Sequence, residues 1–320
     1  MSHTAMKDGT VFYIGGGRAM SNGTTHEVES GRTKVGGTTY DIDLLFGLPS
    51  KRLSLNDMTW EEIRIVSDAG KAANYFSIGD RKGVHLKGTL SDIALDTTYY
   101  CYIIGIDHNS NIEGSNRIHF QFGYTNLVGG VNVGLCDSAY MSGPNDGVWL
   151  NMNNTTSNIG GWKDCNMRNN ICPKFKTVLP SELQAVIKTS SKYSDNVGSA
   201  YQIVTGYDAS TGKNICTPIS PDECMSITED DIFLLSEYEV MGRTIMGNNV
   251  EGSYQQQYSF YALGDSRIRY AHWITTTAVL WWTRSVDDSN DCFWVCITGD
   301  GSTHNPYAPY SFGFCPAFCV

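Results

Sequence analysis

Histidine, cysteine and carboxylate side chains, the groups most often used for catalysis and metal binding, occur here without catalytic spacing. The seven histidines are scattered and form no ligand-like pair: His3, His26, His85, His108, His119, His272 and His304. No P-loop, zinc-protease or serine-hydrolase motif occurs. Gly15-Gly16-Gly17 is not a dinucleotide-binding motif, because Met20 takes the place of the third glycine. We therefore expect no catalytic residue, no cofactor and no enzymatic activity.

Acidic residues gather in three turn-like segments. The loop Asp107–Glu113 has oxygen-bearing side chains at the odd positions of a calcium loop. It lacks the glycine at position six, and Ile118 stands in place of the acid at position twelve. An Asx-rich turn is the better interpretation. The carboxylates at 229–231 and 287–291 are interpreted as solvated turns, so we expect no metal site.

The ten cysteines include no C-x-x-C pair, which excludes zinc ribbons and thioredoxin-type redox sites. The first ten residues are polar and show no signal-peptide pattern, so we expect synthesis in the cytoplasm, where thiols stay reduced. Most cysteines are interpreted as small buried hydrophobic residues. Whether any of them pair is left open.

Composition and charge exclude several classes of partner. The net charge of −10 and the absence of any Lys or Arg run argue against nucleic acid. The longest apolar run, Ala278–Trp282, is too short to cross a membrane. The 33 glycines and 18 tyrosines favour turns, strands and recognition surfaces over helical bundles.

The pattern of the chain predicts an α+β fold with long irregular loops. Thr59 and Glu62 form a capping box for a helix that ends at Gly70, and Ser236 and Glu239 form another before Gly242. Further helices are expected at 162–168 and after Pro180. Strands are expected at 75–86, 98–106, 117–123, 232–235, 254–261 and 275–284, from period-two or short apolar runs.

Residues 11–50 carry an internal repeat of 14 residues. The segment 17–28 aligns with 31–42, and each unit has Asn-Gly or Gly-Gly before Thr-Thr, which is the turn chemistry of a tight hairpin. Two hairpins cannot form a core by themselves. Residues 1–50 are therefore predicted to be an attachment or homo-oligomerisation segment that packs on another chain. The alternative is a β-extension folded onto its own domain.

The C-terminal stretch interleaves two kinds of residue. Phe293, Val295 and Ile297 alternate with polar or mixed positions, and the even positions from Phe312 to Val320 form a second apolar face. The intervening segment 302–311 is polar and aromatic, without apolar periodicity. Such residues are typical of recognition surfaces, because they give contact area and hydrogen bonds at modest entropic cost.

The closing block of the chain resembles that of a C-type-lectin-like family found in bacteria and phages. The resemblance rests on Trp281-Trp282-Thr283-Arg284-Ser285, then Phe293-Trp294-Val295, Gly299-Asp300-Gly301 and Gly313-Phe314-Cys315-Pro316-Ala317-Phe318. Upstream segments at 59–63, 75–80, 179–186 and 233–237 are similar to phage-encoded members. The family includes variable proteins of diversity-generating retroelements, in which adenine-directed mutagenesis rewrites codons of the terminal block.

This resemblance implies a rigid frame that carries a changeable, hypervariable ligand-binding face within residues 270–320. The frame positions are Trp281, Trp282, Arg284, Ser285, Phe293, Val295, Gly299, Gly301, Gly313, Pro316 and Phe318. The implied ligand-binding residues, here called the display positions, are His272, Trp273, Asp287, Asp288, Ser289, Asn290, Asp291, Trp294, Cys296, Ser302, Thr303, His304, Asn305, Tyr307 and Tyr310, with Ile274 beside them.

The chain departs from the sugar-binding C-type lectins, since their E-P-N or Q-P-D and W-N-D calcium motifs are absent. Formylglycine-generating oxidases share the broad fold but need a cysteine pair for copper. Cys292 and Cys296, or Cys315 and Cys319, lie four residues apart, which is about 13 Å along a strand, so one metal could not bridge either pair directly. Such an oxidase and an inert virion protein remain the alternatives.

The expected protein is thus a non-enzymatic receptor- or ligand-binding protein, phage-encoded and located in the virion tail tip or fibre, or associated with a bacterial cell. Residues 51–320 would form the C-type-lectin-like domain and residues 1–50 the attachment segment. The ligand would be a protein or a cell-surface glycan. Neither nucleic acid nor membrane insertion is expected.

Overall fold

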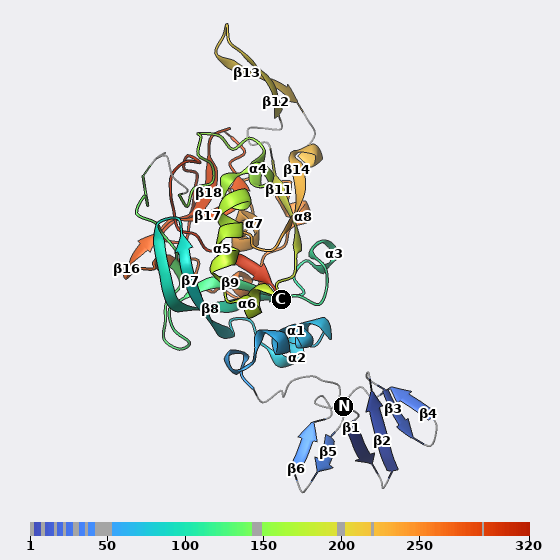
Figure 1. Cartoon of the computed structure of the whole chain (residues 1–320). Helices are drawn as coiled ribbons and strands as arrows, with labels where there is room; N and C mark the ends of the chain where they lie inside the picture. The colour runs from blue at the N-terminus through green and yellow to red at the C-terminus, as the bar shows by residue number, and fades with distance from the viewer. Residues whose placement is uncertain are drawn as a thin grey trace.

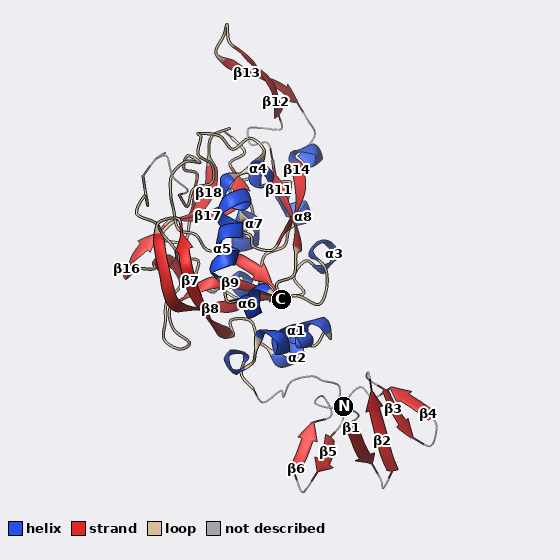
Figure 2. Ribbon diagram, viewed as in Figure 1, coloured by secondary structure: helices blue, strands red, loops and turns tan. Residues whose placement is uncertain are grey.

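The structure is a computed structural model of the chain. It describes residues 53–142, 149–196, 202–218, 221–289 and 291–320, together with six strands within residues 3–41. The fold is a mixed α+β arrangement, as the sequence predicts (Figure 2). No helix in the described part of the chain is long and apolar enough to cross a bilayer.

The largest sheet of the main body joins the first and last strands of that body. Its order is β20-β9-β8-β7, with all neighbours antiparallel (Figure 1). The strands are β7 (Arg81–Leu90), β8 (Ile93–Ile106), β9 (Ile118–Tyr124) and β20 (Ala317–Cys319). The sheet is curled into a half-barrel, and the side chains of β9 from Ile118 to Gly123 are buried on both faces. Both faces are buried because helices and loops pack on each side.

Helix α1 (Trp60–Asp68) begins at the predicted capping box, in which Thr59 and Glu62 bond each other's backbone amides. Gly70, with φ +65°, follows the last turn as expected. The ring of Trp60 lies edge-on to Phe120 at 5.6 Å and to Phe318 at 6.1 Å. The helix thus closes one face of the main sheet where β9 and β20 pair.

Three smaller sheets complete the main body. They are β10 (Val133–Gly134) with β15 (Arg269–Ala271) and β16 (Ile274–Val279); β11 (Ser190–Asp195) with β14 (Met225–Asp230); and β17 (Trp281–Val286) with β18 (Trp294–Ile297) and β19 (Thr303–His304). A separate hairpin pairs β12 (Gln202–Asp208) with β13 (Lys213–Pro218). Strands β18 and β19 contain the predicted binding residues Trp294, Cys296, Thr303 and His304.

The remaining helices are short. They are η2 (Leu55–Asp57), α2 (Ala72–Tyr75), α3 (Ser110–Glu113), α4 (Gly161–Asp164), η3 (Met167–Ile171), α5 (Cys172–Val178), α6 (Ser181–Gln184), η4 (Pro221–Cys224), α7 (Glu237–Met241), α8 (Glu251–Tyr254) and α9 (Ser259–Ala262). Helix α7 has the predicted capping box at Ser236 and Glu239 and stops at Gly242, whose φ is +73°. The capping motifs therefore located both helices correctly.

Several expected strands are wrong. Residues 232–235 form no strand, although Phe233 makes an isolated bridge to Ala317. The segment 254–261 contains parts of helices α8 and α9 instead of a strand. The strand expected at 275–284 is two strands, β16 and β17, in different sheets. Short apolar runs fit a buried helix turn or a buried loop as well as a strand, so their length does not decide between them.

The N-terminal strands form hairpins, as the repeat predicts. β3 (Arg18–Ser21) pairs with β4 (Thr24–Glu27), and β5 (Arg32–Val35) pairs with β6 (Thr38–Asp41), both antiparallel. A further hairpin of β1 (His3–Lys7) and β2 (Thr10–Gly15) adds to the first. In both repeats two residues separate the last paired positions, which fits the predicted tight turns; those turn residues lie outside the described ones.

Candidate functional site

The segment Trp281–Ser285 belongs to the interior of the protein. All five side chains are fully buried in β17. The Trp281 indole donates to the carbonyl oxygen of Arg267 at 2.9 Å, and the Trp282 indole donates to that of Leu150 at 3.1 Å. The burial of Trp281, Trp282, Arg284 and Ser285 agrees with their interpretation as frame positions, whereas the frame positions Phe293, Gly299 and Gly301 are half-buried.

Arg284 forms an ion pair with Glu239 in the interior. Its Nη2 donates to Glu239 Oε1 at 2.8 Å, Nη1 contacts Oε2, and Nε donates to Ser194 Oγ at 2.9 Å. Burial raises the pKa of Glu239, but the charges of Arg284 and Lys192 outweigh burial and hold that pKa at about 2. Glu239 also caps helix α7, so this pair fixes the helix against strand β17.

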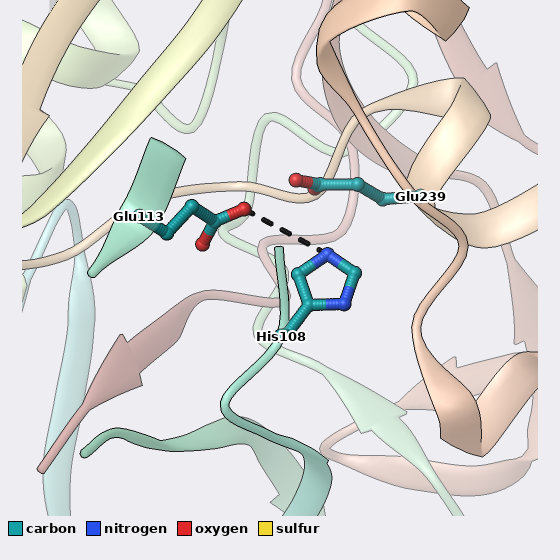
Figure 3. A group of neighbouring side chains, drawn as sticks. All are labelled: His108, Glu113 and Glu239. Carbon is teal, nitrogen blue, oxygen red and sulfur yellow. Dashed lines mark ion pairs between the residues drawn. The ribbon is translucent and has the colours of Figure 1, made fainter. Parts of the chain in front are cut away.

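A larger buried ionic cluster surrounds this pair. Lys192 Nζ contacts Glu113 Oε2, lies 3.5 Å from Glu239 Oε1 and donates to the hydroxyl of Tyr258 at 2.9 Å. The ring of His108 stacks on that of Tyr258 at 3.7 Å. Figure 3 shows Glu113 and Glu239 converging on the imidazole of His108, with 3.7 Å between His108 Nε2 and Glu113 Oε1. We call these residues, with Arg284 and His119, the buried ionic cluster.

The cluster corrects two expectations. His108 and His119 are not scattered: their ring centroids lie 5.6 Å apart, and His119 Nδ1 lies 3.1 Å from the hydroxyl of Tyr258. Glu113, expected in an Asx-rich turn, is buried in helix α3. Sequence reasoning missed this site because its members come from five distant segments, and no local pattern links them.

His108, Glu113 and Glu239 have the chemistry of metal ligands, and their ligand atoms lie within 4.8 Å of one another. However, the Lys192 ammonium already contacts both carboxylates. With Arg284, the two cations balance the two carboxylates, so an added dication would leave an uncompensated charge in a dry interior. Burial lowers the pKa of His108 to about 3, so its ring is neutral. The arrangement fits an internal ion network better than a metal site.

The display positions divide into three groups by exposure. Trp273, Ile274, Ser289, Ser302, His304 and Tyr307 are exposed, and His272, Asp288, Asp291, Thr303, Asn305 and Tyr310 are half-buried. Asn290 lies outside the described residues. Asp287, Trp294 and Cys296 are buried, which corrects the expectation that they face the ligand.

The three buried display positions have physical reasons for their burial. The Trp294 indole lies 3.4 Å from the carbonyl oxygen of Ser157, so the loop that contains Ser157 covers this face of β18. Cys296 is on the same side of the strand. Asp287 Oδ2 accepts a hydrogen bond from Asn305 Nδ2 at 2.9 Å, which ties two loops together. The period-two pattern placed Trp294 and Cys296 on one face correctly, but it could not show that a distant loop covers that face.

Aromatic rings connect the two ends of the exposed set. Trp273 lies 6.4 Å from Tyr140, and Tyr140 lies 6.1 Å from Phe312. Phe312 stacks with Tyr310 at 6.1 Å, and Tyr310 with Tyr307 at 6.4 Å. We call these five residues the aromatic strip. Trp273 is 54% exposed and Tyr307 is 44% exposed, so the strip reaches solvent at both ends. Sequence reasoning missed Tyr140, because the residues on either side of it in the sequence are not aromatic.

A groove of about 440 Å³ lies at the Trp273 end of the strip. It is lined by Asp92, Ile93, Cys136, Asp137, Ser138, Tyr140, His272 and Trp273. We call it the Trp273 groove. The backbone amide of Cys136 donates to His272 Nδ1 at 3.2 Å, which fixes the imidazole in the wall. Here the predicted display residues meet residues of the first half of the chain.

A second groove of about 440 Å³ lies beside helix α5 and strand β14. Four of its charged side chains already form ion pairs, Arg168 with Asp230 and Lys176 with Asp231, both at 2.6 Å. None of the residues described in the lining of the Trp273 groove forms such an ion pair, so this groove leaves its charged groups available to a ligand.

Comparison with known protein families finds one family model that matches this chain. The model described as "Domain of unknown function (DUF6273)" matches residues 146–320, which is 175 of the 320 residues. The chain belongs to the DUF6273 family. The DUF6273 region contains Lys192, Glu239 and Arg284 and all of the display positions, whereas His108 and Glu113 precede it. No curated protein and no solved structure matches the chain.

Proposed function

We propose that the chain is a non-enzymatic ligand-binding protein that uses the aromatic strip and the neighbouring exposed display positions as its contact surface. The single observation that carries the proposal is the aromatic strip, which connects exposed Trp273 with exposed Tyr307 beside the fully buried segment Trp281–Ser285. Aromatic anchors flanked by small polar residues are the usual composition of a recognition surface. The ligand is a protein or a cell-surface glycan.

The proposal includes the C-type-lectin-like fold and a place among the variable proteins of diversity-generating retroelements, in a phage or phage-like setting. Two features support it. Frame residues Trp281, Trp282 and Arg284 are fully buried and anchored. By contrast, eleven display positions and Ile274 are exposed or half-buried; the three buried positions named above and Asn290 are the exceptions. Substitution at exposed positions costs little stability, whereas substitution in a packed core is costly.

The cysteines favour binding over oxidase chemistry. Burial raises the pKa of both Cys315 and Cys319 to about 12, so the thiolate that copper or nucleophilic chemistry requires is suppressed. Most described cysteines are buried, as the sequence predicts, and they contribute to packing.

A binding screen tests the proposal. The wild type and the variant Trp273→Ala/Tyr307→Ala/Tyr310→Ala are screened on host-cell lysates, intact cells and glycan arrays. The matched control is Tyr207→Ala/Leu263→Ala, since these side chains are 65% and 72% exposed and lie outside the strip. We expect the triple variant to lose binding and the control to retain it. Equal binding by the wild type and the triple variant would remove the site assignment.

Sibling copies of the gene offer an independent test of the retroelement origin. Differences concentrated at exposed display positions such as Trp273, Ser289, Ser302 and Tyr307 are expected, with Trp281, Trp282 and Arg284 constant. Differences spread evenly over residues 270–320 contradict the origin, but they leave the binding surface itself to the screen above.

A further inference from the structure

The Trp273 groove carries negative charge without a cation of its own. In the part of the chain that the structure describes, its lining includes Asp92 and Asp137 and no lysine or arginine. Asp137 is 1% exposed and accepts hydrogen bonds from the amides of Ala139 and Leu150 and from the hydroxyls of Ser91 and Ser311. Four neutral donors around one carboxylate are the pattern of an ionised group. Asp92 accepts from the amide and hydroxyl of Ser138. Among the described residues, neither carboxylate has an ion-pair partner.

Two aromatic rings stand beside these carboxylates. The Trp273 indole is more than half exposed, and Tyr140 meets it edge-on at an interplanar angle of 76°. The hydroxyl of Tyr140 accepts from the amide of Leu280 at 3.0 Å, which fixes that ring. Tryptophan has the strongest attraction for a cation among the aromatic side chains, and the attraction grows when a ligand is partly desolvated.

The third wall of the groove adds no positive charge. Burial lowers the pKa of His272 to about 4, so the imidazole is neutral at physiological pH. Because His272 Nδ1 accepts the amide of Cys136, the ring proton lies on Nε2. This wall therefore presents a hydrogen-bond donor suited to a carbonyl oxygen, without repelling a cation beside it.

We propose that the Trp273 groove binds an arginine side chain of a protein ligand, with the guanidinium between the Trp273 ring and the Asp92 carboxylate. Arginine stacks on aromatic faces and pairs with carboxylates through a planar fork of donors, which matches both walls. The net charge of −10 of the whole chain favours a basic partner as well. The inference rests on the proposed ligand-binding function and names the chemistry at one end of its surface.

The proposal has a consequence for diversified siblings. Asp92, Asp137 and Tyr140 lie outside the predicted variable region of 270–320, whereas His272 and Trp273 lie within it. The negative half of the groove would then stay constant while the aromatic wall changes. Siblings would share a preference for basic side chains and differ in what surrounds them.

A peptide pair that differs only in charge tests the groove. The probes are acetyl-Gly-Gly-Arg-Gly-Gly-amide and the same peptide with citrulline, the neutral isostere of arginine. Binding is followed by NMR through the indole N–H of Trp273, assigned by its loss in Trp273→Phe. We expect affinity on the order of 1 mM for the arginine peptide. The citrulline peptide should bind roughly 5-fold more weakly or worse, because the cation–π and ion-pair contributions are lost.

Two variants complete the test on the full-length protein. Asp92→Asn keeps an acceptor for Ser138 but removes the charge. It should lower the affinity for the arginine peptide by about 3- to 10-fold and leave the affinity for the citrulline peptide unchanged. Tyr207→Ala, in the exposed hairpin, should change the affinity for neither peptide. Equal affinity for both peptides, no shift of the Trp273 indole, or a preference for neutral oligosaccharides overturns the proposal. A ligand from the screen that depends on Tyr307 and Tyr310 but not on Asp92 would leave the proposed function standing without the groove.

Discussion

At the scale of single residues, the best-defined feature is the buried pair of Arg284 and Glu239. Sequence reasoning placed Arg284 in the frame, and its burial agrees. Its partner could not be predicted, because 45 residues separate the two and Glu239 had a sufficient local role as a helix cap. The same holds for the cluster around Lys192, whose contacts with Glu113 and Tyr258 span 79 and 66 residues.

The first prediction concerns this pair. Arg284→Met should destabilise the protein by about 3–5 kcal/mol, because it leaves the Glu239 carboxylate buried beside a single cation. The double variant Glu239→Gln/Arg284→Met should recover part of that loss, since the unpaired charge is removed with its partner. Urea denaturation gives both values. A double variant no more stable than Arg284→Met would contradict the assignment of the loss to an unpaired charge.

The second prediction concerns Glu251, whose carboxylate accepts from the hydroxyl of Ser285 at 2.6 Å. Burial, with the nearby charges of Asp195 and Glu237, raises its pKa to about 8 from the ordinary 4.5. Between these values the folded protein holds a proton that the unfolded chain has lost. Stability from this group is thus fully present below pH 4.5 and is lost as the pH rises through 8, with a slope approaching about 1.4 kcal/mol per pH unit.

The variant Glu251→Gln removes this titration and keeps an acceptor for Ser285. Its free energy of unfolding, measured in urea across pH 5 to 9, should therefore depend less on pH than that of the wild type in this window. Parallel pH profiles for the two proteins would show that Glu251 is ionised in the folded state, contrary to expectation.

At the scale of elements, capping motifs predicted more reliably than apolar runs. Helices α1 and α7 begin at the expected Thr59 and Ser236, because a cap is a local hydrogen-bond pattern that can be read within four residues. The segment 232–235 is apolar and buried, and burial does not distinguish a strand from a turn or a short helix. The segment 254–261 mixes aromatic and polar residues, of which some are buried and some exposed, and this pattern fits short helices as well as a strand. Strand β18 is covered on both faces, so its alternation did not mark a solvent side.

The third prediction concerns the junction of β9 with β10. Gly123 has φ +116°, and a Cβ at this position would lie 2.2 Å from the carbonyl oxygen of Val133. Gly123→Ala should therefore destabilise by roughly 1–3 kcal/mol from overpacking, beyond the backbone strain. Gly79→Ala is the matched control, since Gly79 also has positive φ (+88°) but nothing within 4 Å. Thermal denaturation compares the two; equal losses would mean that only the dihedral angle matters.

At the scale of the whole molecule, the family match covers residues 146–320, whereas the main sheet draws three of its four strands from before residue 146. β20 inserts the end of the family region beside β9, so the two parts share one sheet. The division into residues 1–50 and 51–320 stays a prediction. The 14-residue repeat correctly indicated paired hairpins, because turn chemistry fixes short hairpins locally.

The fourth prediction concerns these hairpins. Removal of residues 1–50 should leave the folding of the remaining chain intact and lower its oligomeric state in light scattering. Binding to a surface that carries many ligand copies should weaken by a factor on the order of 100 or more, while affinity for a monovalent ligand stays the same, because avidity is lost without any change in contacts. An unchanged oligomeric state would favour the β-extension interpretation.

The burial of the tryptophans has an optical consequence. Trp60, Trp162, Trp281, Trp282 and Trp294 are all at most 3% exposed and Trp149 is partly covered, whereas Trp273 is 54% exposed in the wall of its groove. Long-wavelength emission and quenching by acrylamide should therefore report mainly on this single indole. A bound partner that covers the ring would shift the emission to the blue and protect it from the quencher, so the unlabelled protein carries its own fluorescent sensor of occupancy.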